Sequence, residues 1–306
     1  MKFFIFFLSL FFSLSSYALD NDCKTNVFKE IPHLTKMVES YPFRIWYADS
    51  GIHALEASAD NRISSKPENI INDLLLQLHS ADKYFSENLG LEPPLSSERF
   101  GQAKFIDVYL LSMKAGMGIA FDEPIIEKAT KNSEPLDCGI KFHLNKKIKP
   151  SYNLTPAHEL FHLYQYANSM FKTRWYLEGM ANWIGEPFLG LVSKNINTAV
   201  EDVSCGDVYA ESYSAIRYWR DLAKRKKSAD VLAGEELLNI FYSDGRPVFK
   251  VNTFKHGSII KDIFEKLKEV SVQSSNDMNM SLYKWPEKLQ RSNVFDSSIC
   301  NAVESI

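Results

Sequence analysis

The residues from 155 to 170 read TPAHELFHLYQYANSM, and they set the expected fold and site. Thr155 is a favourable N-cap and Pro156 suits the first helical position, so we expect a helix from there to about Met170. His158 and His162 stand four positions apart within it. Side chains at that spacing project from one face of a helix, where two imidazole nitrogens can bind one cation. The stretch therefore predicts a metal-binding helix.

Glu159 completes the pattern H-E-x-x-H and stands where its carboxylate can reach a water held on that metal. A catalytic site with an open coordination position needs a third protein ligand. Glu178 offers one on a second expected helix, from Trp175 to about Glu186. Imidazole and carboxylate donors favour zinc, and we expect one Zn²⁺ ion. The alternative is a surface helix that carries the pattern by chance.

The chain before this helix is expected to form a small mixed sheet with a long helix across it. The long helix is predicted over Pro67–Leu89, because apolar residues recur there at helical spacing and Gly90 then ends it. Runs rich in β-branched and aromatic residues indicate strands. Strands are expected at Phe43–Tyr47, Phe105–Leu111, Gly116–Asp122 and Gly139–Leu144.

The chain after the metal-binding helix is expected to be mostly helical, which gives an α+β fold class. Further helices are predicted near Val208–Arg225, Gly234–Phe241 and Ile259–Val270, whereas the tail from Val272 to Trp285 is polar and shows no clear pattern. We expect a signal peptide over residues 1–18, a catalytic subdomain over 19–190, and a helical C-terminal subdomain over 191–306 that completes the cleft.

The first 18 residues have the organisation of a secretory signal. Lys2 precedes an apolar run from Phe3 to Phe12, which is shorter than the roughly 20 residues that span a bilayer. Small residues at Ser16 and Ala18 favour cleavage after Ala18. We therefore expect an exported protein, periplasmic or extracellular, with no stable membrane insertion. An N-terminal membrane anchor is the alternative.

Four cysteines follow the predicted signal, and an even number in an exported protein favours two disulfides. Three pairings are possible among Cys23, Cys138, Cys205 and Cys300. A thiolate metal site is disfavoured because the sequence has no C-x-x-C pair. The formal net charge of −3 gives no indication of nucleic acid or an anionic membrane as a partner.

These motifs resemble the gluzincin clan of zinc metallopeptidases, in which H-E-x-x-H is completed by a glutamate within E-G-x-A-x-W/Y. Residues 178–183 read EGMANW. The chain is also similar to exported bacterial metalloproteases related in pattern to hyicolysin-type peptidases. Those carry F-R-I-x-Y, L-G-x-x-P-P, D-V-Y-L and H-E-x-F-H-x-x-Q, which occur here in the same order at 43–47, 89–94, 107–110 and 158–165. The likeness covers about residues 42–225 and implies a zincin-like fold. One departure lies at Asn61–Pro67, where relatives tend to carry a segment rich in Asp, Asn and Gly that could hold calcium. Residues 60–63 read DNRI, which is too sparse in such residues to predict a calcium site.

The roles follow from this chemistry and from the resemblance. Glu159 would act as general base and then deliver the proton to the leaving amine. Gluzincins commonly stabilise the oxyanion with a downstream tyrosine or histidine, and Tyr213 is preferred here over Tyr209 and His256. The two tyrosines are four apart and are expected on one helical face, although core packing is their alternative role. Gln165 is expected to bond a ligand or the substrate, and Glu186 to brace a histidine, unless both are ordinary polar residues.

The leading hypothesis is a secreted zinc endopeptidase whose partner is a protein or peptide substrate. The segment Gly116–Asp122 would act as an edge strand to which an extended substrate can add. An aminopeptidase is the second hypothesis, although no motif that anchors an amine is evident. The third is a secreted binding protein that retains the metal helix without catalysis. The sequence gives no indication of the oligomeric state.

Overall fold

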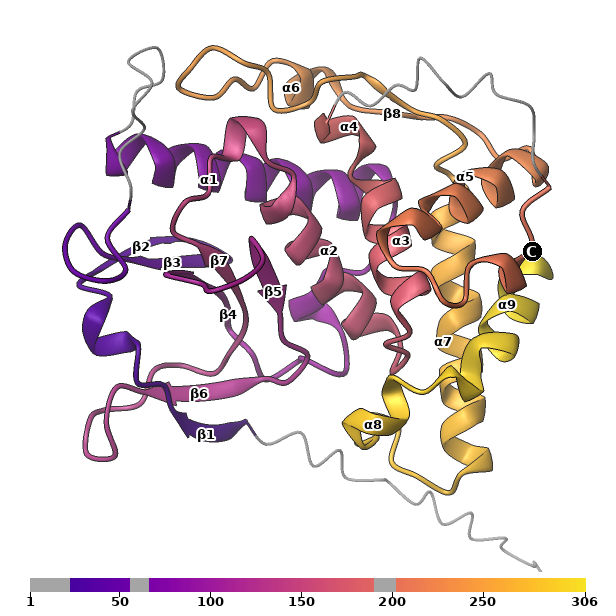
Figure 1. Ribbon diagram of the computed structural model, residues 1–306, viewed down its shortest axis with the longest axis horizontal. Helices are drawn as coiled ribbons and strands as arrows, with labels where there is room; N and C mark the ends of the chain where they lie inside the picture. The colour runs from indigo at the N-terminus through magenta and orange to yellow at the C-terminus, as the bar shows by residue number, and fades with distance from the viewer. Residues whose placement is uncertain (1–22, 56–65, 190–201) are drawn as a thin grey trace, which may run out of the picture.

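The computed structural model describes residues 23–55, 66–189 and 202–306. The predicted signal peptide, the segment 60–63 and the predicted domain boundary at residues 190 and 191 lie outside the described residues. Among the described residues, the chain forms one mixed sheet and a set of helices beside it. Figure 1 shows the strands on the left, α3, α5, α7 and α9 on the right, and α2 between the two groups. The mixed architecture agrees with the predicted α+β class.

Seven described strands form the sheet, with β3, β4 and β7 parallel at its centre. The short strand β5 runs antiparallel to β7. Along the main path the order is β1 (Lys24–Val27), β6 (Ile125–Lys128), β7 (Gly139–Asn145), β4 (Phe105–Leu111), β3 (Phe43–Tyr47) and β2 (Lys36–Ser40), with β5 spanning Gly118–Ala120. All four predicted strands are present, although β5 is shorter than expected.

The two faces of the central strands differ in chemistry because side chains alternate along a strand. Ile45, Val108 and Phe142 stand in register on one face, where they are fully buried in the main hydrophobic core. Arg44 and Asp107 stand in register on the other face, joined by two hydrogen bonds of 2.8 and 2.7 Å. The apolar face is the one on which the helices can pack.

Two helices carry the core between the sheet and the site. The long helix α1 (Pro67–Lys83) begins at the predicted proline and runs into a π-helical turn, and Gly90 follows with a positive φ of 68°. The helix α2 (Thr155–Asn168), which carries the predicted metal ligands His158 and His162, packs against α1, β5 and β7. Its start differs from the prediction. Leu154 occupies the cap position, and the Asn153 Oδ1 atom accepts the Thr155 N–H bond at 2.8 Å.

The remaining described elements are mostly helical, as predicted for this part of the chain. The α-helices are α3 (Arg174–Ile184), α4 (Glu186–Leu189), α5 (Ile216–Arg225), α6 (Glu235–Leu238), α7 (Ile259–Asp277), α8 (Glu287–Gln290) and α9 (Asp296–Glu304). A two-stranded pair joins β8 (Val231–Leu232) to β9 (Thr253–Phe254). Short 3₁₀ helices cover Ile31–His33, Pro94–Ser96, Pro150–Tyr152, Cys205–Asp207, Tyr213–Ala215 and Asn293–Phe295.

The helix predicted over Val208–Arg225 is wrong in its first half. The α-helix starts only at Ile216, after two separate 3₁₀ turns. Ser204 and Asp207 form a capping box at the first of these turns. Ser212, before the second turn, has φ −129° and ψ −107°, outside the helical region. The chain therefore changes direction between the turns. The prediction that Tyr209 and Tyr213 share one helical face is therefore wrong.

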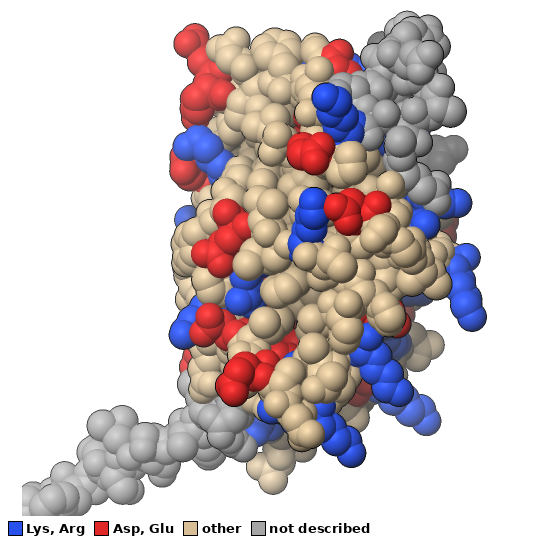
Figure 2. Space-filling view, turned by 90° about the vertical axis from the view of Figure 1, so that its left-hand side faces the viewer, with Lys and Arg blue, Asp and Glu red and all other residues tan. Residues whose placement is uncertain are grey.

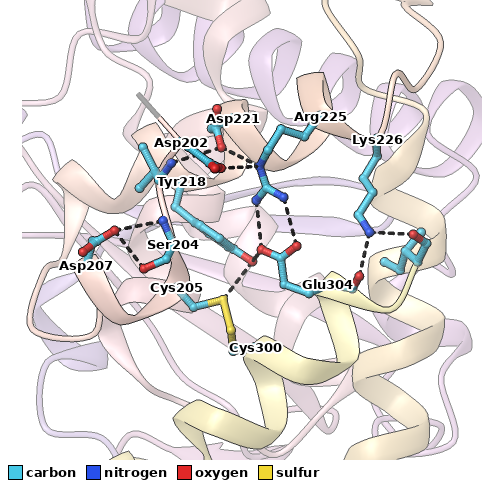
Figure 3. Close-up of polar contacts among 12 residues, drawn as sticks. Asp202, Ser204, Cys205, Asp207, Tyr218, Asp221, Arg225, Lys226, Cys300 and Glu304 are labelled. Atoms are coloured by element: carbon cyan, nitrogen blue, oxygen red, sulfur yellow. Dashed lines mark hydrogen bonds and ion pairs between the residues drawn. A yellow bond between two sulfur atoms is a disulfide. The ribbon is translucent and has the colours of Figure 1, made fainter. Parts of the chain in front are cut away.

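Two disulfides select one of the three possible pairings, Cys23–Cys138 and Cys205–Cys300. They indicate that the chain folds in an oxidising environment. Figure 3 shows that the second disulfide lies beside an ion-pair cluster that fixes the end of α9 to α5. There the Glu304 carboxylate accepts two bonds from Arg225, at 2.9 and 3.1 Å. Among the described residues, no helix is long and apolar enough to cross a bilayer.

Candidate metal centre

The two histidines and the glutamate of the predicted ligand set lie together. One donor atom from each of His158, His162 and Glu178 falls within 4.8 Å of the others. The Glu178 Oε2 atom is 3.1 Å from His158 Nε2 and 3.6 Å from His162 Nε2. Donors about 2.0–2.1 Å from a tetrahedral ion lie about 3.3 Å apart, so the spacing suits one such ion. The sequence prediction that these three residues form a group is confirmed.

Close packing of α3 against the segment after it brings Glu178 to this position. A Cβ atom on Gly179 would lie 2.7 Å from the Cβ atom of Ala215, so no larger residue fits without movement. The close neighbour of Gly179 is the 3₁₀ turn that carries Tyr213 and Ala215.

Gln165 fixes the orientation of one imidazole. Its side chain is fully buried, and its Oε1 atom lies 2.8 Å from His162 Nδ1. The amide nitrogen donates to the carbonyl oxygens of Leu177 and Tyr176, at 3.3 and 3.5 Å. With the Oε1 atom as acceptor, Nδ1 carries the proton and Nε2 keeps its lone pair for a metal. Gln165 therefore joins α2 to α3 and orients His162, one of the two roles expected for it.

The carboxylate of Glu159 lies next to this group under β5. Glu159 is 6% exposed, and burial raises its pKa to about 7, although a hydrogen bond from the Ala120 N–H group opposes the shift. A Cβ atom on Gly118 would approach the Glu159 Cγ and Oε1 atoms to 2.5 Å. The glycine thus lets β5 pass directly over the carboxylate. The sequence predicted a strand at Gly116–Asp122, but it did not predict that this strand contacts Glu159.

Electrostatics favour the anionic form of Glu178 and the neutral form of His158, whereas the carboxylates favour the protonated form of His162. Burial would raise the pKa of Glu178, but hydrogen bonds from His158 and His162 hold it well below its usual value. Burial lowers the pKa of His158, which keeps its ring neutral. Burial also acts to lower the pKa of His162, but the nearby carboxylates of Glu178 and Glu159 raise it above the usual value. Glu178 is thus an anion facing two imidazoles.

The structure separates the two tyrosines proposed for the oxyanion. The Tyr213 ring lies 5.9 Å from the His158 ring and is 53% exposed. Partial burial raises the pKa of Tyr213, as do the charges of Glu178 and Glu159 and a hydrogen bond to Glu178. Tyr209 packs instead on Trp175, with ring centroids 5.5 Å apart, and bonds to Ser297. Tyr213 faces the group of His158, His162 and Glu178, here called the metal group, whereas Tyr209 belongs to the contact between α3 and α9.

Two other predicted residues have different partners from those expected. Glu186 forms an ion pair with Arg220 rather than bracing a histidine. His256 adopts a left-handed φ of 56°, and its Nδ1 atom bonds the Ser228 carbonyl oxygen at 2.9 Å. Sequence reasoning overlooked Tyr166, whose ring is stacked on His162 with centroids 6.0 Å apart. Its position one turn after His162 on α2 is the signal that could have revealed it.

Comparison of the chain with protein-family models, curated proteins and solved structures gives no match. The chemistry of the site therefore rests on its own geometry. Two imidazoles and one carboxylate can hold a divalent cation, and a second carboxylate lies beside them without belonging to the ligand set. Such an arrangement can bind a metal ion and can take up a proton next to it.

Removing one imidazole should remove the metal. We expect wild-type protein loaded with Zn²⁺ to retain one ion per chain after dialysis, and His162→Ala to retain almost none, because two donors hold the ion far less tightly than three. Elemental analysis measures the ratio. His33→Ala, which removes an exposed histidine, is the matched control. Equal metal content in wild type and His162→Ala would show that the ligand set is wrong.

Removing the Gln165 acceptor should weaken metal binding without abolishing it. In Gln165→Leu the His162 N–H group loses its partner and the ring loses its fixed orientation, so we expect affinity for Zn²⁺ to fall about 10–100-fold. Competition with a chromophoric chelator measures this affinity. Gln165→Glu retains an acceptor oxygen and should retain more of the affinity. If Gln165→Leu binds as tightly as wild type, Gln165 has no orienting role.

Proposed function

We propose that this protein is a secreted zinc-dependent metallopeptidase that hydrolyses peptide bonds, with a zincin-like arrangement of its sheet and metal helix. The observation that carries the proposal is the meeting of His158, His162 and Glu178 within 4.8 Å, with the buried carboxylate of Glu159 adjacent. The two disulfides support folding outside the cytoplasm. The signal-like residues 1–18 are the basis for export.

The donor set fits zinc better than the hard cations. Two imidazole nitrogens and one carboxylate oxygen suit Zn²⁺, whereas Mg²⁺ and Ca²⁺ prefer oxygen ligands throughout. When bound, Zn²⁺ supplies a water of lowered pKa and polarises the scissile carbonyl. His158, His162 and Glu178 hold the ion, and Gln165 keeps His162 in the required tautomer.

Glu159 is the proposed general base. Its Oε atoms accept a proton from the attacking water and then pass it to the leaving amine nitrogen. Burial makes the neutral form accessible near pH 7, so the same carboxyl group can take up and release the proton. The Ala120 N–H bond and the close passage of Gly118 hold the side chain in place.

Tyr213 is the proposed donor to the oxyanion. Its phenol lies on the His158 side of the metal group and is accessible to a substrate. The hydroxyl proton is retained at neutral pH because burial and the nearby carboxylates raise its pKa. A preorganised O–H donor aimed at developing negative charge lowers the barrier of acyl transfer.

The strand β5 is the proposed binding site for the substrate backbone. It pairs with β7 on one side, and Ile119 at its centre is 47% exposed. An extended peptide that adds to such an edge would lie directly above Glu159. The face of the molecule in Figure 2 intermixes basic and acidic side chains, which gives no support to a nucleic-acid partner.

The positive charge of Arg174 favours internal cleavage over aminopeptidase activity. The exposed cation Arg174 acts electrostatically on Tyr213, so it lies near the proposed oxyanion donor. A cation there would repel the free ammonium group that an aminopeptidase must bind. A binding protein without catalysis remains the third hypothesis. Digestion of a proteome-derived peptide library, with and without chelator, separates it from the peptidase: chelator-sensitive cleavage supports the proposal, and no cleavage by zinc-loaded protein contradicts it.

Replacing the proposed base should separate catalysis from metal binding. We expect Glu159→Gln to keep one zinc ion per chain while its kcat falls by about 10²–10⁴-fold, because the amide cannot accept the proton. Elemental analysis and assays with an internally quenched peptide measure the two properties. Glu269→Gln, an exposed glutamate on α7, is the control. Full turnover by Glu159→Gln would remove Glu159 from the mechanism.

The two tyrosines provide a matched pair for the oxyanion. We expect Tyr213→Phe to lower kcat by about 10²-fold with a small effect on KM, because the hydroxyl acts mainly in the transition state. Tyr209→Phe should keep its kcat, since its ring packs on Trp175 away from the metal group. Steady-state kinetics on one peptide compare both variants. Equal losses of kcat in the two would contradict a specific role for Tyr213.

A further inference from the structure

Arg174 begins α3 one helical turn before the metal ligand Glu178. Side chains four positions apart lie on the same face of a helix, so Arg174 is on the side of α3 that presents Glu178. Arg174 is exposed, and its charge acts on the Tyr213 phenol. A guanidinium group therefore stands at the accessible edge of the proposed catalytic site.

Among the described arginines, Arg174 differs from the others in having no acidic partner within the described residues. The structure describes eight of the nine arginines, and within the described ranges no hydrogen bond or ion pair joins Arg174 to another residue. Each of the other seven contacts a carboxylate. The pairs are Arg44–Asp107, Arg99–Asp122, Arg217–Glu211, Arg220–Glu186, Arg225–Glu304, Arg246–Asp244 and Arg291–Glu287.

The position of this cation is also unfavourable for the helix itself. Positive charge in the first turn opposes the helix dipole, which stabilises acids there instead. The nearest acid on the same face, Glu178, has its Oε2 atom directed at His158 and His162. An arginine placed before a glutamate at this spacing is in addition the weaker orientation for a helical ion pair. Folding therefore gives no reason for a cation at this position.

We propose that Arg174 binds a carboxylate of the substrate and so sets a preference for acidic peptides. The carboxylate is either an Asp or Glu side chain close to the scissile bond or the free C-terminus of a short peptide. Both offer the two oxygens that a guanidinium group binds with paired hydrogen bonds. This preference rests on the proposed peptidase function, but the carboxylate-binding role can be measured separately.

Matched peptides test the preference. Internally quenched peptides with Glu or Gln at each position flanking the scissile bond compare a side-chain carboxylate with its neutral isostere. A second set compares free and amidated C-termini. We expect wild-type kcat/KM to be about fivefold to tenfold higher for the carboxylate member of one set, the effect of one accessible charge-assisted contact. The responding set identifies the source of the carboxylate.

Variants assign the preference to this residue. Arg174→Gln should bring the ratio of kcat/KM values close to one while retaining zinc, and Arg174→Lys should keep part of it because the charge remains. Lys131→Gln removes an exposed cation from the β6–β7 connection, on the far side of the sheet from α3 in Figure 1, and should keep the wild-type ratio. A wild-type ratio near one, or an unchanged ratio in Arg174→Gln, would overturn the proposal.

Binding without turnover separates this inference from the peptidase function. Fluorescence anisotropy measures binding of labelled Glu and Gln peptides, and of a free and amidated pair, to zinc-loaded Glu159→Gln protein. Tighter binding of the carboxylate peptide, lost when Arg174→Gln is added, supports the role of Arg174 even if the wild type cleaves nothing. In that event only the proposed function fails. Equal binding of both members in each pair overturns the inference, whether or not peptides are cleaved.

Discussion

The contact of one Glu178 oxygen with two imidazole nitrogens is the interaction on which the site and its surroundings depend. Two helices must meet closely to make it, since the histidines lie on α2 and the glutamate on α3. Gln165 bridges these helices from within the core, and Gly179 allows the Tyr213 turn to approach α3. Burial without partners would be costly for each of these polar groups. The contacts that satisfy them therefore also define how the helices pack.

Two neighbouring carboxyl groups, those of Glu178 and Glu159, have different pKa values because their surroundings differ. Glu178 faces imidazoles and stays anionic, whereas burial beneath β5 raises the pKa of Glu159 to about 7. Pairs of acids whose environments push their pKa values apart can perform different tasks in one reaction. The separation follows from the fold. The histidines lie on one face of α2, and Gly118 brings the strand over the intervening residue.

The parts of this structure that follow from short-range periodicity could be predicted from the sequence, and those set by tertiary contacts could not. Spacing of four on a helix was enough to group His158 and His162, but no local signal reveals the change of direction at Ser212. The choice among three disulfide pairings is likewise set by the whole fold. The helix α7 runs to Asp277, beyond its predicted end, because Ser271 and Ser275 form part of its buried face. The Ser271 hydroxyl accepts a bond from the Met170 N–H, and the Ser275 hydroxyl accepts one from the Trp285 indole. Because serine is polar, the sequence does not indicate that these positions are buried.

Two cations at the start of α3, Lys172 just before the helix and Arg174 as its first residue, have very different surroundings. Lys172 is 4% exposed and is held by Asp122 and Glu287, at 2.8 and 2.5 Å. Arg174, two residues later, is exposed and has no carboxylate partner among the described residues. The charge of Lys172 is balanced by these two carboxylates, so it can contribute to stability but is not available to a ligand. Arg174 retains its full charge beside Tyr213, and a negatively charged ligand is the partner that this arrangement lacks.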